Sequence, residues 1–246
     1  MSVNPSYEKL DKPLCIEYPA AVENLRLTNT GAFWEVRIPY QISVTTNLFG
    51  AQLSQQNRYN LDRFHCHWGE EDEWQTGSEH TVDGRGFSAE LHFVHYNMEK
   101  YHTLSKAARH PDGLAVVGVF IEASDEHHKH AELEKIVSNL RTIQLKTEHT
   151  TIRHTVRLEN LLPTNRSFWA YSGSLTTPPH LESVSWFVFK QPIKCSRTQI
   201  QKFRDLQSSL KPDPSLCVTS NLRKTQPLNG RTIYDYETNN KSNSSR

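Results

Sequence analysis

The stretch RFHCHWG, residues 63–69, places two histidines one residue apart inside an aromatic run. If the run forms a β-strand, alternate side chains point to the same side, so His65 and His67 share one face of the strand. Two imidazoles on one face can chelate a metal ion. A bare pair of strand histidines more often only hydrogen-bonds to its neighbours, so the pair alone leaves a metal site and a structural pair as open alternatives.

A third histidine follows in AELHFVHYN, residues 89–97. On a strand, Glu90, His92 and Val94 share one face, whereas His95 points to the opposite face. A histidine that binds zinc through one ring nitrogen needs an acceptor for the other nitrogen, often a carboxylate. Glu90 is in phase to supply that acceptor, so we expect His92 rather than His95 to join the pair.

Three neutral histidines predict a catalytic zinc site. They leave a tetrahedral Zn²⁺ with one open position, whereas a structural zinc has four protein ligands. An all-nitrogen shell retains the double positive charge of the ion, which favours ionising a bound water molecule near neutral pH. Zn²⁺ is therefore the predicted cofactor.

The rest of the chain favours a mainly β domain. Short runs rich in Val, Phe, Trp and Ile recur at 32–38, 63–68, 88–97, 114–123 and 182–190. Helical spacing of apolar residues appears at about 131–140 and 198–210. The 246 residues contain no linker or internal repeat, so we expect one domain with a few peripheral helices.

Charge and cysteine content exclude several classes of protein. The 28 Lys and Arg residues against 27 Asp and Glu residues give a net charge of +1, which argues against nucleic acid as the main partner. No apolar run approaches the roughly 18 residues of a membrane-spanning helix, and the first residues show no secretory signal. The four cysteines are too sparse for a disulfide scaffold. We expect reduced thiols in the cytoplasm, or a secreted protein if the N-terminus is truncated.

Five motifs in one order resemble those of the α-class carbonic anhydrases. They are FHxHWG, SEHTVDG, AELHxVH, GSLTTPP and NLRKTQPLNGR, and the similarity runs from about Pro5 to about Arg231. Each motif alone is modest, but the five together are very specific. The resemblance implies a single domain over residues 1–235, built on a large twisted, mostly antiparallel central sheet with a few peripheral helices. A polar, disordered tail is expected over 236–246.

The resemblance also implies an activity. The expected reaction is the reversible hydration of carbon dioxide to bicarbonate and a proton by a zinc-bound hydroxide. Carbon dioxide and bicarbonate are then the small-molecule substrates. Such a lyase contributes to pH homeostasis, and we expect a monomer without nucleic-acid or membrane partners.

Roles for individual residues follow from the resemblance, position by position. His65, His67 and His92 match the zinc ligands. The Thr176 hydroxyl matches one that accepts the proton of the zinc-bound hydroxide, and Glu79 matches the buried acid that accepts the proton of the threonine. The remaining matches are an apolar wall for carbon dioxide (Val94, Val116, Leu175, Val184 and Trp186), a bicarbonate contact (Thr177), and orienting groups for the second and third zinc histidines (Asn221 and Glu90).

Three departures from the family pattern qualify this expectation. Arg63 stands where the family usually has a glutamine that accepts a hydrogen bond from the first zinc histidine, and arginine has no acceptor. Ala32 stands where fast members carry the histidine that shuttles protons, so no shuttle is expected there and turnover should be moderate. A family segment with a Gln-Ser-Pro motif is expected to be missing before residue 1.

Two other functions remain as alternatives. Non-catalytic relatives have lost one or more zinc histidines and this chain retains all three, so an inactive binding module is the weaker alternative. A zinc hydrolase of peptides usually has a HExxH helix, which the sequence lacks. Zinc content together with saturable hydration of carbon dioxide separates the enzyme from an inactive module.

Overall fold

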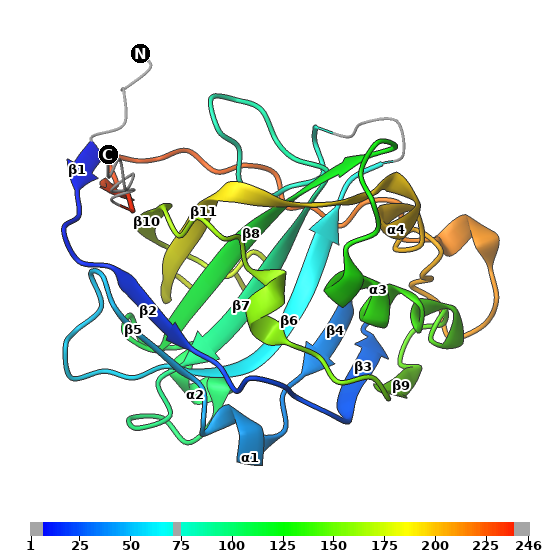
Figure 1. Ribbon diagram of the computed structural model, residues 1–246, viewed down its shortest axis with the longest axis horizontal. Coiled ribbons are helices and arrows are strands. Elements are labelled where there is room, and N and C mark those ends of the chain that lie inside the picture. The colour runs from blue at the N-terminus through cyan, green and yellow to red at the C-terminus, as the bar shows by residue number, and fades with distance from the viewer. Residues whose placement is uncertain (1–6, 71–74, 239–246) are drawn as a thin grey trace, which may run out of the picture.

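The computed structural model describes residues 7–70 and 75–238, and one large sheet dominates them (Figure 1). Within this part of the chain, ten strands form the sheet in the order β1-β12-β10-β11-β8-β7-β6-β4-β3-β9. They are β1 (Tyr7–Lys9), β3 (Leu25–Asn29), β4 (Trp34–Arg37), β6 (Asn60–Trp68), β7 (Ala89–Tyr96), β8 (Leu114–Ser124), β9 (His149–Ile152), β10 (Phe168–Gly173), β11 (Val184–Ser196) and β12 (Ile233–Tyr236). A separate small sheet pairs β2 (Leu14–Glu17) with β5 (Asn47–Gly50).

Most neighbouring strands of the large sheet run antiparallel. The exceptions are β8 with β11 and β1 with β12, which are parallel. Figure 1 shows the sheet strongly twisted, with short helices outside it. The helices are α1 (Tyr40–Ser43), α2 (Leu104–Ala107), α3 (Ala131–Val137) and α4 (Arg197–Gln201), with 3₁₀ turns at Leu140–Thr142, Leu158–Leu161 and Pro214–Leu216. The prediction of a mainly β domain on a large twisted, mostly antiparallel sheet is confirmed.

Both predicted helices are longer in the prediction than in the structure. The helix predicted over 131–140 is present as α3, which ends at Val137, and a 3₁₀ turn follows at Leu140–Thr142. The helix predicted over 198–210 ends at Gln201. Beyond it the backbone of Leu206 accepts a hydrogen bond from Val218, and the Gln207 N–H donates to Gln144. Pairing with distant backbone therefore overrides the local helical spacing.

The two central strands β6 and β7 have faces of different chemistry. On one face Phe64 stacks on Phe93 with ring centroids 5.2 Å apart, and both are fully buried in the main apolar core. Burying a phenylalanine contributes about 1.5–3 kcal/mol. A slip of one residue would turn these rings away from the core, so their burial fixes the register that presents the histidines on the other face.

Register across the sheet aligns residues of the other face in rows. His65 lies directly opposite His92, and His67 lies opposite Glu90. The next row runs from Arg63 on β6 through Val94 and Val116 to Trp186 on β11. Predicted metal ligands and predicted substrate wall therefore occupy adjacent rows of one face.

Three further expectations concern the outside of the domain. No helix in residues 7–70 and 75–238 is long and apolar enough to cross a membrane. Cys15, Cys66, Cys195 and Cys217 are free. Tyr236, at the start of the predicted tail, instead pairs with Phe168 in the sheet, and residues 239–246 lie outside the described part of the chain.

Candidate metal centre

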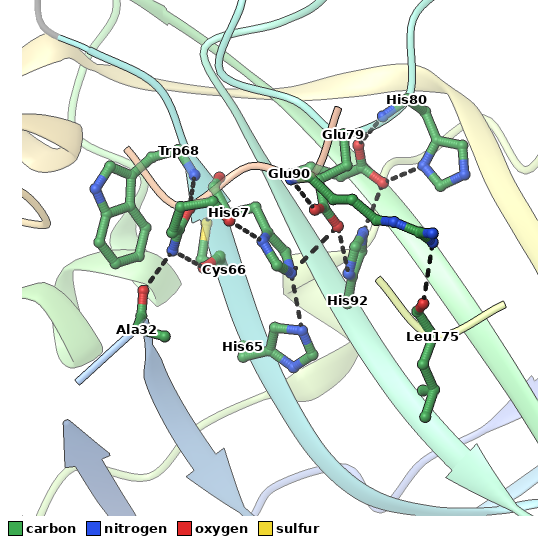
Figure 2. Close-up of polar contacts among 12 residues, drawn as sticks. Ala32, His65, Cys66, His67, Trp68, Glu79, His80, Glu90, His92 and Leu175 are labelled. Carbon is green, nitrogen blue, oxygen red and sulfur yellow. Dashed lines mark hydrogen bonds and ion pairs between the residues drawn. The ribbon is translucent and has the colours of Figure 1, made fainter. Parts of the chain in front are cut away.

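Three histidine rings from β6 and β7 converge on one point (Figure 2). One ring nitrogen from each of His65, His67 and His92 lies within 4.8 Å of the others, and all three residues are buried. The Nε2 atoms of His65 and His67 are 3.1 Å apart. Two nitrogens bound to one tetrahedral zinc at 2.0–2.1 Å are separated by about 3.3 Å, so the observed spacing fits that ion.

Burial keeps at least two of these rings neutral. Loss of solvent, reinforced by His67, His92 and Arg63, holds the pKa of His65 well below its usual value. Loss of solvent also lowers the pKa of His67, although Glu79 opposes the change. A neutral imidazole offers a lone pair to a metal ion, so the lowered pKa values of His65 and His67 favour the form that a zinc site requires.

Two of the three rings are oriented by hydrogen bonds on the side away from the meeting point. His92 Nε2 lies 2.7 Å from Glu90 Oε1, which leaves its Nδ1 on the side of the triad. His67 Nδ1 donates to the Asn221 carbonyl at 3.1 Å, which leaves its Nε2 on the side of the triad. Glu90 and Asn221 thus each contact the ring nitrogen that faces away from the meeting point.

His65 is held differently. Its Nδ1 is buried and has no hydrogen-bond partner among the described residues. The ring instead stacks on Phe33, with centroids 4.5 Å apart and planes inclined by 24°. Sequence reasoning did not identify Phe33. This residue directly precedes β4, and its ring contacts His65 of β6 only because the two strands pair in the sheet.

Arg63 directs its guanidinium to acids rather than to His65. Nη1 lies 2.9 Å from Glu35 Oε2, and Nε lies 2.9 Å from Asp62 Oδ2. Burial alone would lower the pKa of Arg63, but the two carboxylates raise it. Arg63 therefore remains a charged donor, in keeping with the expectation that it cannot accept from the first histidine.

Glu79 and Thr176 lie near the triad but are not hydrogen-bonded to each other. Glu79 Oε1 accepts the backbone N–H of Arg223 at 2.8 Å. Its Oε2 lies 3.4 Å from His67 Nε2 and has no hydrogen-bond partner among the described residues. Thr176 lines a cavity together with Glu79. The residues of the predicted relay thus share one cavity, without the hydrogen bond that the prediction requires between them.

The predicted substrate wall forms an apolar cluster beside the triad. Val94, Val116, Val184 and Trp186 are buried in this cluster, and Leu175 packs against it. The Trp186 ring lies 4.8 Å from the His92 ring, and its Nε1 donates to the Ser174 carbonyl at 3.1 Å. An apolar surface therefore adjoins a potential metal ligand.

A cavity of about 570 Å³ opens over His67. Ala32, Thr176 and Thr177 line it, as does His180. The sequence predicted the first three as site residues, and Ala32 also accepts a hydrogen bond from the Asn221 side chain at 2.9 Å. Position 32 therefore faces the cavity but carries no side chain able to move a proton.

His80 is a site residue that sequence reasoning missed. Its Nδ1 lies 2.6 Å from Glu90 Oε1 and its Nε2 lies 2.6 Å from the Tyr171 hydroxyl. Burial opposes protonation of His80, but Glu90 and Tyr171 raise its pKa to about 10. The charged ring compensates the Glu90 carboxylate. Burial alone would raise the pKa of Glu90, but His80 and His92 hold that pKa well below its usual value.

Gly118 makes room for that carboxylate. It lies opposite His92 on β8, and a Cβ atom there would be 3.1 Å from Glu90 Oε1. Any larger residue would press on the oxygen that orients His92. A glycine inside the apolar run of residues 114–123 is the only signal that the sequence offers for this contact.

Known proteins are similar to this chain over most of its length. The family profile for eukaryotic-type carbonic anhydrases matches residues 2–237. Carbonic anhydrase 7 of Mus musculus and that of Homo sapiens are each 41% identical over 223 residues, which cover 90% of this chain and 80% of each relative. Mitochondrial carbonic anhydrase 5A of Rattus norvegicus is 40% identical over 227 residues, covering 92% of this chain and 71% of the relative. With the buried histidine triad, these matches establish that the chain belongs to the eukaryotic-type carbonic anhydrase family, the zinc lyases that hydrate carbon dioxide.

Proposed function

We propose that this carbonic anhydrase works at moderate turnover, with His65, His67 and His92 holding Zn²⁺ and the apolar cluster receiving carbon dioxide. The observation that carries the proposal is the convergence of three buried imidazoles next to Trp186. When bound there, Zn²⁺ supplies hydroxide from water at neutral pH by lowering the pKa of that water. Every other task falls to the side chains of the chain.

The apolar cluster binds the substrate in this proposal. Carbon dioxide is small, linear and nonpolar, so it offers little to hydrogen-bond. Val94, Val116, Leu175, Val184 and Trp186 provide a surface of matching chemistry beside the triad. Thr177, which lines the adjacent cavity, supplies a hydroxyl for the bicarbonate anion.

Thr176 and Glu79 position the proton during the reaction. Glu79 is buried, and its Oε2 is an acceptor without a hydrogen-bond partner among the described residues. If the Thr176 hydroxyl donates its proton to this oxygen, the hydroxyl can only accept from the reacting group. That arrangement orients the reacting oxygen and excludes groups without a proton to donate.

Glu90 and Asn221 hold two of the ligands in place. Each takes the ring nitrogen that faces away from the metal position, so the other nitrogen points toward it. Partners of this kind are typically worth 10–100-fold in metal affinity or activity. Arg63 gives no such help to His65, which should make this ligand the least firmly held of the three.

The compartment, the oligomeric state and the domain limits are also proposals. We propose a cytoplasmic monomer with one domain over residues 1–235. Four free cysteines support a reducing compartment. Cell fractionation tests the compartment, and sedimentation of the purified protein tests the oligomeric state.

Metal analysis and stopped-flow hydration on one sample test the proposed function. We expect one zinc per chain and saturable hydration of carbon dioxide. Because Ala32 cannot carry a proton, turnover should rise with the concentration of imidazole buffer, whereas kcat/KM should depend on it far less. Ala32→His should raise turnover in dilute buffer. A zinc-loaded protein without hydration activity would refute the proposal.

A further inference from the structure

His180 is a histidine of the cavity that no step described above uses. It follows the Thr177–Pro179 turn, and its N–H donates to the Thr177 carbonyl at 2.9 Å. The side chain is half-buried and lines the cavity of about 570 Å³ that His67 and Thr176 also line. Its Nδ1 lies 3.3 Å from the Leu175 carbonyl, whereas Nε2 has no hydrogen bond to any other part of the described chain.

The reaction creates a need that this residue fits. Carbon dioxide and water give bicarbonate and one proton, so one proton must reach solvent in each turnover. The cavity of about 570 Å³ is far larger than one water molecule needs, so water can occupy the space that His67 and His180 both line. Ala32 adds no proton acceptor to that cavity.

Within the described residues, the other titratable or charged side chains that line the cavity are less suited to the task. His67 is committed to the Asn221 carbonyl on one side and to the triad on the other. Arg223 is always protonated and donates to the Ser174 hydroxyl at 3.0 Å. Cys217 carries a thiol, which is a weak donor and a weak acceptor.

We propose that His180 is a proton-relay residue of this site, an inference that rests on the proposed function. His180 carries only part of the proton flux, so turnover stays moderate and still rises with added imidazole. The proton released in each turnover passes through water to Nε2 of the neutral ring, which becomes an imidazolium. A buffer base or water at the cavity rim then removes the same proton from Nε2 and restores the neutral ring. Nδ1 carries a proton in both states, so its contact with the Leu175 carbonyl is kept throughout.

The backbone of His180 dictates the choice of variant. Its φ is 59°, in the left-handed region that asparagine tolerates better than most residues. His180→Asn keeps that conformation and removes the titrating ring. His110→Gln is the matched control, because His110 is exposed, stacks on Tyr101 and does not line the cavity.

The kinetic test separates proton transfer from the carbon dioxide step in the zinc-loaded enzyme. A positioned proton-transfer group is worth roughly 10²-fold or more, and water and buffer replace part of it, so we expect His180→Asn to lower kcat in dilute buffer on the order of 10-fold. Its kcat/KM and zinc content should match the wild type, and added imidazole should restore kcat. His110→Gln should behave as wild type in every measurement.

A second readout needs neither activity nor zinc. In the ¹⁵N spectrum of the wild-type protein, we expect His180 to be the tautomer with its proton on Nδ1, which donates to the Leu175 carbonyl and leaves Nε2 as an open acceptor. The tautomer with its proton on Nε2 would overturn the relay, and so would unchanged kcat in His180→Asn. A parallel loss of kcat and kcat/KM would assign His180 a structural role and overturn it as well. A wild-type enzyme without zinc-dependent hydration would fail the proposed function itself, which is a different result.

Discussion

Arg63 is ion-paired to Glu35 beside the metal centre, with Nη1 2.9 Å from Glu35 Oε2. Glu35 lies directly opposite His65 on the neighbouring strand β4. The pair therefore surrounds the first histidine of the triad with a charged donor and an acid already engaged by that donor. His65 Nδ1 gains no hydrogen bond from either, in contrast to the oriented rings of His67 and His92.

Arg63→Gln should slow the loss of zinc. A glutamine oxygen can accept from His65 Nδ1, and an outer partner of this kind is typically worth 10–100-fold in metal affinity. The rate of zinc transfer to a chelator measures the effect. Arg37→Gln is the control, since Arg37 contacts the same Glu35 at 3.4 Å but is mostly exposed. Equal or faster zinc loss in Arg63→Gln would show that Arg63 is not the weak point of the site.

His92→Ala should remove most of the bound zinc and reduce hydration to background, because two ligands remain of three. His95→Gln alters the neighbouring histidine on the opposite face and should keep stoichiometric zinc. Metal analysis of both proteins makes the comparison. Near-native zinc and turnover in His92→Ala would contradict the ligand assignment.

Thr176→Ala should keep its zinc and lose turnover by about 10²-fold, the scale expected when one positioned proton-handling group is lost. Glu79→Gln should behave similarly, because an amide can donate to the threonine and reverse the required hydrogen bond. Stopped-flow hydration with metal analysis checks both variants. Native turnover in Thr176→Ala would reduce that residue to a structural part of its turn.

His95 should make stability depend on pH. Burial lowers its pKa to about 3, from a value of about 6.5 in the unfolded chain. The unfolded state therefore binds a proton below pH 6.5 that the folded state does not, and stability falls as pH falls between 6.5 and 3. The slope for one such group is about 1.4 kcal/mol per pH unit.

His95→Gln should remove that part of the slope. Urea unfolding of both proteins, in the same metal state at pH 7 and at pH 5, measures it. The variant should be less stable at pH 7, because its contacts with Tyr18 and Phe93 change, but it should lose less stability on acidification. An unchanged slope would mean that His95 does not carry the effect.

Local periodicity explains what the sequence could predict. The alternation of a strand is enough to place His65 with His67 on one face of their strand, and Glu90 with His92 on one face of theirs. Only the register of β6 with β7, seen in the structure, brings the two pairs together. The same alternation correctly separates His95 from that face. These predictions depend on neighbours within two residues, where the backbone geometry is fixed by the strand itself.

Long-range contacts explain what the sequence could not predict. His80 joins Glu90 to Tyr171. Tyr171 lies 91 residues after His80, and no local pattern links these positions. The helix predicted over 198–210 failed beyond Gln201 for the same reason, since Leu206 pairs with Val218. Asn221 could be assigned only through the resemblance to a family, because its carbonyl reaches His67 across 154 residues.

The stacking of Phe33 on His65 bears on how the site takes up metal. The Asn221 carbonyl demands a proton on Nδ1 of His67, and Glu90 demands one on Nε2 of His92, so each of these rings is locked in a single tautomer. An aromatic face restrains the plane of the His65 ring but is indifferent to which nitrogen carries the hydrogen. Binding of the ion therefore includes the selection of one tautomer of His65, which has an entropic cost. For His67 and His92 the same selection is already made when the chain folds.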